Sequence, residues 1–145
     1  MQDVMIEVIN LKKYYPIRGT FFRGAKAVHA VDGVSFQILK GESFGLVGES
    51  GCGKTTTGKC ILRLVEPTSG VINWNGRDIL KLNKKELRKA RLKMQMIFQN
   101  PHTSLNPVMA VQKILNEALE VRGVTSKRAQ REEVNELMRE VELPL

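Results

Sequence analysis

Alternation of apolar and polar residues marks the first third of the chain. Val4, Ile6 and Val8 fall on one face of an extended backbone, which predicts a strand. Pro16 cannot continue a central ladder, so we expect it to end this first segment. The strands predicted in this part cover 4–9, 28–31, 34–38 and 44–47. Their order indicates an antiparallel layer that leads into a further strand at 44–47.

Helical periodicity follows and finally continues alone. After residue 54 the apolar residues recur at mostly helical intervals until Pro67 stops the segment. The pair Asn75-Gly76 is a strong hairpin signal and closes a strand at 71–74. The last helix has Thr125 or Ser126 as its N-cap. We predict helices at 55–65, 84–91, about 108–123 and from about 127 onward, and a buried strand at 94–98.

This order predicts an α/β fold with an N-terminal antiparallel β layer. We expect a core of mixed strands and helices over 1–103 and an all-helical arm over 104–145. The 145 residues, 42% of them apolar, suffice for one hydrophobic core. We expect no secretory signal and no apolar run long enough to cross a bilayer. The two cysteines lack metal-ligand spacing, which favours reduced thiols in the cytosol.

The stretch 48–55, Gly-Glu-Ser-Gly-Cys-Gly-Lys-Thr, fits a phosphate-binding loop. Glycines let backbone N–H groups approach an anion, and the predicted helix after the loop turns its positive end toward that anion. Lys54 can reach the β- and γ-phosphates, and the hydroxyl of Thr55 can bind Mg²⁺. A Gly-rich turn without a ligand is the alternative. The apolar run before the loop and the helix after it favour nucleotide binding.

The chain carries a net charge of +8, and much of it comes from 81–93. Seven basic residues stand in this segment against one acidic residue, Glu86. The segment predicts either a nucleic-acid footprint or a solvated basic helix face, with anionic lipid or phosphate nearby. Because no aromatic residues interleave the cations and no nucleic-acid motif is present, we favour the solvated face.

Taken together, several motifs resemble the N-terminal half of an ABC transporter ATP-binding subunit, most closely the subunits of dipeptide and oligopeptide importers. The loop 48–56 is followed about 45 residues later by Phe98-Gln99-Asn100-Pro101, which is a strong signal of this family. The segment 104–107, Ser-Leu-Asn-Pro, indicates the peptide importer branch. Segments 10–16, 30–36 and 66–70 also match, so that the resemblance covers essentially the whole chain.

The resemblance implies roles for particular residues. Tyr15 stands where the family places an aromatic that stacks on adenine, with Tyr14 as the rival one position away. Gln99 resembles the glutamine that touches Mg²⁺ or the attacking water, and we assign catalytic roles to Lys54 and Gln99. Thr55 and Gln99 are the expected Mg²⁺ contacts. The expected ATP contacts are Tyr15, Gly48, Ser50, Gly51, Cys52, Gly53, Lys54, Thr55 and Thr56.

The chain also departs from the family pattern. We find no Ser-Gly-Gly-Gln signature and no apolar strand ending in Asp-Glu within 108–145. We therefore expect a truncated P-loop NTPase core that binds ATP and Mg²⁺ and hydrolyses ATP negligibly, whereas its full-length parent would be an ATPase. The parent would drive peptide import with membrane permease subunits and a second ATP-binding subunit, peripheral to the cytoplasmic side of the inner membrane. It would not bind the transported substrate itself.

A second hypothesis stays open at the level of sequence. A soluble ABC-type or other P-loop protein that acts on nucleic acid or the ribosome would use the basic segment 81–93 as its contact. We expect nucleic acid not to be a partner, for the reasons given for that segment.

Overall fold

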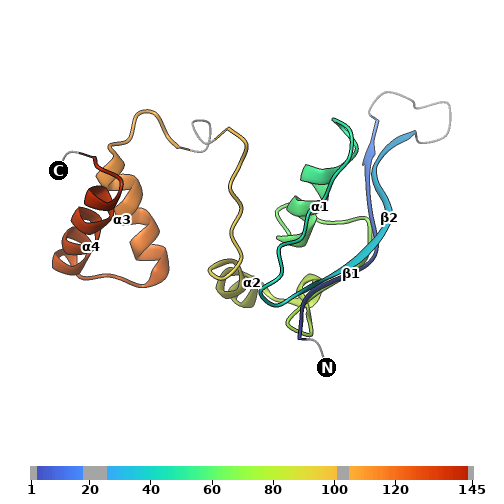
Figure 1. The fold of residues 1–145 in the computed structure, drawn as a ribbon, viewed down its shortest axis with the longest axis horizontal. Helices are drawn as coiled ribbons and strands as arrows, with labels where there is room; N and C mark the ends of the chain where they lie inside the picture. Colours follow the sequence, from blue (N-terminus) through green and yellow to red (C-terminus); the bar gives the residue numbers. More distant parts are fainter. Residues whose placement is uncertain (1–2, 18–25, 101–104, 144–145) are drawn as a thin grey trace. The chain divides into compact units, whose positions relative to one another are not determined.

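The structure is a computed structural model that describes residues 3–17, 26–100 and 105–143. It divides into two compact units, Met1–Gln95 and Met96–Leu145. Each unit is described by itself (Figure 1). The predicted boundary between a nucleotide-binding core (1–103) and a helical arm (104–145) stays a prediction.

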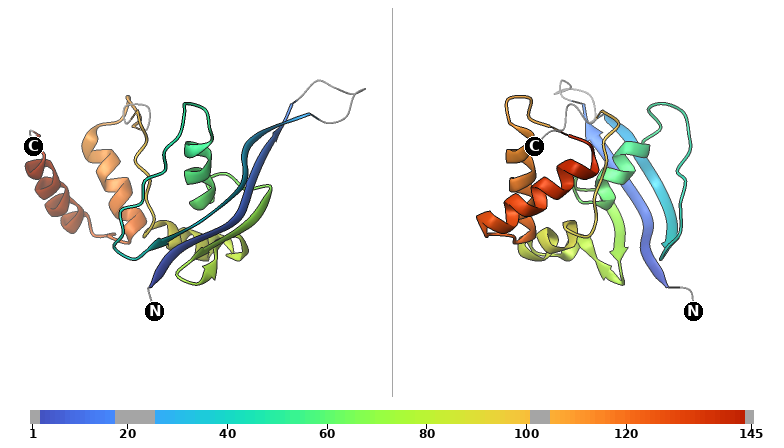
Figure 2. Two further views of the ribbon diagram at one scale, coloured as in Figure 1. Left: turned by 45° about the vertical axis from the view of Figure 1, so that its right-hand side comes forward. Right: turned by 60° about the vertical axis from the view of Figure 1, so that its left-hand side comes forward.

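A four-stranded antiparallel sheet in the order β2-β1-β3-β4 is the framework of the first unit. Its two longest strands run side by side in every view (Figure 1 and Figure 2). The strands are β1 (Val4–Pro16), β2 (Ala27–Leu39), β3 (Ser69–Trp74) and β4 (Arg77–Asp78). The predicted antiparallel layer is confirmed.

The strands β1 and β2 are longer than the sequence predicts. The predicted break between 31 and 34 is absent, because the pairing of β1 with β2 continues through a β-bulge. At the bulge Asn10 and Gly33 have positive φ, and the Asn10 N–H donates to the Ser35 hydroxyl at 2.8 Å. Pro16 lies within β1 because β3 pairs with β1 only as far as Lys12. Beyond that point β1 has one neighbour, and a residue without an N–H is tolerated.

Two predicted strands, 44–47 and 94–98, are wrong. Both segments lack strand structure, and the side chains of Val47 and Ile97 are each 94% exposed. A strand forms only where its backbone N–H and C=O groups pair with a neighbouring strand, and an exposed segment without such a neighbour can bond to water instead. The part of the chain that the structure describes pairs no strand with either segment.

Helix α1 (Lys54–Ile61) packs on the sheet through Cys60, whose side chain is fully buried. Burial raises the pKa of the Cys60 thiol, and this cysteine therefore remains a neutral apolar core residue. The helix ends four residues before the predicted end at residue 65, since Arg63 adopts a positive φ. The core cluster of this unit comprises Val8, Leu11, Val31, Cys60, Ile72 and Ile79.

The turn and helix predicted after β3 are both confirmed. Asn75 and Gly76 have positive φ and join β3 to β4 as a two-residue hairpin. A short 3-10 helix, η1 (Ile79–Lys81), follows β4, and α2 (Lys84–Arg91) has the predicted bounds. The Asn83 side chain and the Glu86 carboxylate form a capping box at its start.

The second unit holds a pair of packed helices, α3 (Val111–Arg122) and α4 (Lys127–Glu140). Leu119 and Val134 are buried between them, and Arg122 pairs with Glu133 at 2.9 Å. Ser126, one of the two predicted caps, is the N-cap of α4. In the described residues no helix is both long and apolar enough to span a membrane.

Gly70, near the start of β3, lies so close to β1 that there is no room for a side chain. A Cβ at Gly70 would lie 2.7 Å from the Leu11 Cα and the Asn10 carbonyl oxygen, at a φ of +108°. Gly70→Ala should lower the free energy of unfolding by about 3 kcal/mol or more. Gly41 has a similar φ of +78° with open space around it. Gly41→Ala should therefore cost only about 1 kcal/mol. Urea unfolding of both variants measures the difference, and equal losses would contradict the close approach.

Candidate functional site

The loop 48–53 connects the exposed segment 44–47 to α1. Gly51 and Gly53 adopt left-handed φ angles of 84° and 95°, which turn the chain sharply into the helix. A Cβ at Gly53 would lie 2.0 Å from the carbonyl oxygen of Ala30 in β2. The absence of a side chain at Gly53 therefore allows the start of α1 to sit directly against the sheet.

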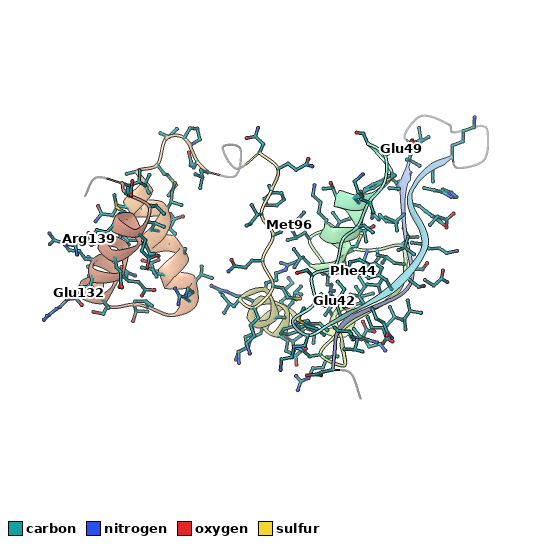
Figure 3. All side chains as sticks on the ribbon, in the orientation of Figure 1. Glu42, Phe44, Glu49, Met96, Glu132 and Arg139 are labelled. Carbon is teal, nitrogen blue, oxygen red and sulfur yellow. The ribbon has the colours of Figure 1, made fainter. Side chains whose placement is uncertain are left out.

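Gly51 serves a different purpose from Gly53. A Cβ at Gly51 would meet no atom within 4 Å. The space over the loop is therefore open at this position, where an approaching anion would need room. Figure 3 shows Glu49 in the same loop, near the start of α1. The loop is held by its backbone, with the Cys52 N–H donating to the Glu49 carbonyl at 3.3 Å.

Several backbone N–H groups of the loop and the first helical turn have no protein acceptor within the described ranges. Gly53, the N-cap of α1, offers no side-chain cap. Among the described residues no protein acceptor is found for the N–H groups of Gly51, Gly53, Lys54, Thr55 and Thr56. Unpaired donors at a helix N-terminus, together with the helix dipole, form an anion-binding site.

The Lys54 ammonium group lies over the loop. Its Nζ donates to the carbonyl oxygens of Gly48 at 2.7 Å and Glu49 at 2.6 Å, and it lies 3.4 Å from the Cys52 Sγ. These contacts fold the lysine back on the loop that precedes it. A phosphate placed on the loop would find a positive charge beside the free N–H groups.

The three successive threonines of α1 have different environments. Thr57 is buried and its hydroxyl donates to the Gly53 carbonyl at 3.0 Å, so this side chain supports the loop. Thr55 is exposed, and its hydroxyl has no partner in the described part of the chain. Thr56 is half-buried. Of the three, Thr55 is the most exposed, and its predicted contact with Mg²⁺ stays a prediction.

Tyr15 lies on the α1 side of the sheet. The Nζ of Lys13 lies 4.8 Å from the centre of the Tyr15 ring and donates to the carbonyl oxygen of Glu66, just after α1. Lys13 is paired across the strands with Val31, a residue of the core. The Val31 side chain lies near Gly53, because a Cβ built at Gly53 would be 3.5 Å from its Cγ2. The Tyr15 side chain is 40% exposed and remains accessible to a ligand.

Tyr14 is occupied by contacts within the protein. Its ring stacks on His29 with 4.0 Å between centroids, and its hydroxyl donates to the Asp32 carboxylate. This hydrogen bond raises the pKa of Tyr14 and, together with His29 and Lys12, lowers the pKa of Asp32. His29 lies in β2, within the strand predicted at 28–31. Tyr14 thus has an aromatic stacking partner within the protein, whereas Lys13 lies over the Tyr15 ring.

Gln99 belongs to the second unit and is exposed. The structure therefore describes it apart from the loop, and its predicted contact with Mg²⁺ stays a prediction. His102 lies outside the described residues. Within the described ranges no three His, Cys, Asp or Glu side chains gather to hold a metal ion.

The residues of the loop fit a nucleoside triphosphate with Mg²⁺. The unpaired N–H groups and Lys54 match the charge and hydrogen-bonding needs of phosphates, and Thr55 offers a hydroxyl oxygen of the type that Mg²⁺ prefers. The sequence predicted the loop residues. It could not show that Gly53 touches Ala30, that Thr57 supports the loop or that Lys13 covers Tyr15, because each contact joins elements through tertiary packing.

Comparison with known proteins agrees with this arrangement. The model of the ABC transporter family matches residues 31–145. The oligopeptide transport ATP-binding protein AppF of Bacillus subtilis (strain 168) is 45% identical over 144 residues, which are 98% of this chain and 44% of AppF. The dipeptide transport ATP-binding protein DppF of Escherichia coli (strain K12) is 39% identical over 143 residues, 99% of this chain and 43% of DppF.

Solved structures give the same result for the fold. The ATP-binding cassette MJ0796, in a dimeric post-hydrolysis state bound to ADP and Pi, matches with a TM-score of 0.74 and 26% identity over 97% of this chain and 58% of that chain. The α/β cassette fold predicted from the sequence is thereby confirmed. The chain spans less than half the length of AppF and DppF. With a family model that covers most of its residues, the chain belongs to the ABC transporter family of ATP-binding proteins.

Proposed function

We propose that this chain provides the phosphate-binding half of an ATP site in a subunit that energises peptide import. The observation that carries the proposal is the loop 48–55, where backbone N–H groups without a protein acceptor in the described residues lie close in sequence to the Lys54 ammonium, and the space at Gly51 is open. The peptide assignment is supported by AppF and DppF, whose names describe oligopeptide and dipeptide transport.

The residues of the loop have separate tasks in this proposal. The N–H groups of Gly51, Gly53 and Thr56 hold the phosphates through hydrogen bonds, and Lys54 leaves its carbonyl partners to pair with phosphate oxygens. The Thr55 hydroxyl holds Mg²⁺, which neutralises charge on the phosphates when it is bound. Gly48, Ser50 and Cys52 contribute backbone that shapes the loop. Tyr15 stacks on the adenine.

Hydrolysis needs more than this loop supplies. Transfer of a phosphoryl group to water requires an oriented nucleophile and donors around the γ-phosphate. We propose Gln99 for a contact with Mg²⁺ or the attacking water. The loop itself offers no carboxylate as a base other than that of Glu49, which is exposed. We therefore expect the 145-residue chain to bind ATP and to turn it over negligibly.

The partners in this proposal are membrane permease subunits and a second ATP-binding subunit in a head-to-tail dimer. The dimeric state of the related cassette MJ0796 supports the second partner. The protein would work on the cytoplasmic side of the inner membrane as a peripheral subunit, without binding the transported peptide.

Removal of the Lys54 ammonium tests the ATP site. Lys54→Ala should weaken binding of a fluorescent ATP analogue in the presence of Mg²⁺ by about thirtyfold, since a charge-assisted contact contributes about 2 kcal/mol. Lys59→Ala removes the same charge from the same helix at a residue with no role in the loop, and it should leave the affinity unchanged. Equal affinities of the two variants would refute the site. ATP turnover by the chain that Lys54→Ala abolishes would contradict the expected lack of hydrolysis.

The adenine contact can be tested separately from the phosphate contacts. Tyr15→Ala should weaken ATP binding by about tenfold, in the range measured for loss of one stacking interaction. The affinity for inorganic tripolyphosphate, measured by competition, should not change. Tyr14→Ala is the matched control, because Tyr14 is already stacked on His29. If Tyr14→Ala rather than Tyr15→Ala weakened ATP binding selectively, the assignment of the two tyrosines would be reversed.

A further inference from the structure

Exposed cations gather on and next to α2, outside the loop 48–55. The segment 81–93 contains seven basic residues and one acidic residue. Two of the seven have partners within the unit: Lys81 pairs with Asp78 at 3.3 Å, and Arg91 donates to backbone carbonyls of residues 62 and 63. The other five have no side-chain partner among the described residues. We name them the α2 basic face: Lys84, Lys85, Arg88, Lys89 and Lys93.

Helical spacing places four of these cations together. At about 100° per residue, Lys84, Arg88, Lys85 and Lys89 fall within an arc of about 140° around α2. Leu87 and Ala90 fall outside this arc, and the Ala90 side chain is buried. Figure 3 shows side chains that end in nitrogen projecting from α2. The helix thus has a buried side and a continuous cationic side.

The single acidic residue of the segment does not neutralise this face. The Glu86 carboxylate accepts a hydrogen bond from the Asn83 N–H at 3.0 Å, as part of the capping box. Its charge is thereby placed at the N-terminus of α2, where it stabilises the helix. An isolated cluster of like charges destabilises a protein by self-repulsion. The cationic side is therefore better explained by a partner with negative charge than by stability.

An apolar hollow lies beside the cations. It has a volume of about 270 Å³. Trp74, Leu82 and Ala90 supply apolar surface, Arg77, Lys89 and Lys93 supply cations, and Glu86 of the capping box completes the lining. Tryptophan, lysine and arginine side chains together are typical of a membrane–water interface. The indole ring lies at the level of the headgroups there, and the cations extend to the headgroup phosphates.

We propose that the α2 basic face docks on anionic phospholipid headgroups of the membrane beside which the protein works. Each Lys or Arg near an anionic lipid surface strengthens binding, and clusters of four to eight are typical of such contacts. The hollow at Trp74 would accept the apolar part of the interface. The proposal rests on the proposed function in one respect, since a transport subunit has a membrane within reach.

A nucleic acid is the competing occupant. Phosphates of RNA would satisfy the same cations, but sequence-tolerant binding of single strands uses several aromatic platforms for successive bases. The hollow has one aromatic residue, Trp74, together with aliphatic surface. This composition favours a lipid surface.

Vesicle binding of the full chain tests the proposal. Co-sedimentation should show binding to vesicles of phosphatidylglycerol and phosphatidylcholine in equal parts, weaker binding at high salt, and none to vesicles of phosphatidylcholine alone. The quintuple variant K84Q/K85Q/R88Q/K89Q/K93Q should bind the anionic vesicles at least about a hundredfold more weakly. The control K113Q/K127Q/R128Q/R131Q/R139Q removes the same charge from the second unit and should bind nearly as the parent chain does.

The remaining measurements separate this proposal from the ATP site. The quintuple α2 variant should keep its circular dichroism spectrum and its affinity for the fluorescent ATP analogue. If Lys54→Ala loses ATP binding and keeps its vesicle binding, the ATP site and the α2 basic face are separate sites, and both proposals are supported. Equal loss of vesicle binding in the α2 variant and the control would overturn the docking face, because net charge alone would then explain it. Binding of a short RNA that is tighter than vesicle binding and is lost in the α2 variant would likewise overturn it.

Discussion

The contact of Gly53 with the carbonyl of Ala30 is the constraint on which the loop depends. It brings the N-terminus of α1 to the surface of the sheet and fixes the direction in which the loop opens. Any side chain at Gly53 would push the helix away from β2. Glycine also has no side-chain oxygen to cap the helix, and the first N–H groups of α1 have no protein acceptor in the described part of the chain. One residue thus sets both the position of the helix and its unpaired donors.

Sequence patterns predicted the local elements well. The helix at 84–91, the hairpin at Asn75-Gly76 and the N-cap at Ser126 each depend on residues close in the chain, so the sequence contains the information that determines them. The loop 48–55 was recognised for the same reason. Its glycines, lysine and threonine are consecutive or nearly so, and a motif of that kind is complete in one short stretch.

Errors arose where structure depends on distant partners. The apolar segments 44–47 and 94–98 have strand composition, yet a strand exists only when another strand satisfies its backbone. The sequence did not predict that β1 extends to Pro16. Proline is excluded from a strand with a neighbour on each side, and the pairing of β1 with β3 reaches only Lys12. The stacking of Tyr14 on His29, which distinguishes the environment of Tyr14 from that of Tyr15, likewise comes from tertiary packing.

The hydrogen bonds of Lys54 to its own loop have a consequence for how a ligand is exchanged. Because Nζ already binds the carbonyls of Gly48 and Glu49, an arriving phosphate does not meet a bare charge but replaces existing acceptors. The affinity gained is then the difference between two sets of contacts, which limits tight binding. When the ligand leaves, the lysine has acceptors to return to, and no charge is left without a partner. A loop with this property can keep its shape through repeated cycles of binding and release.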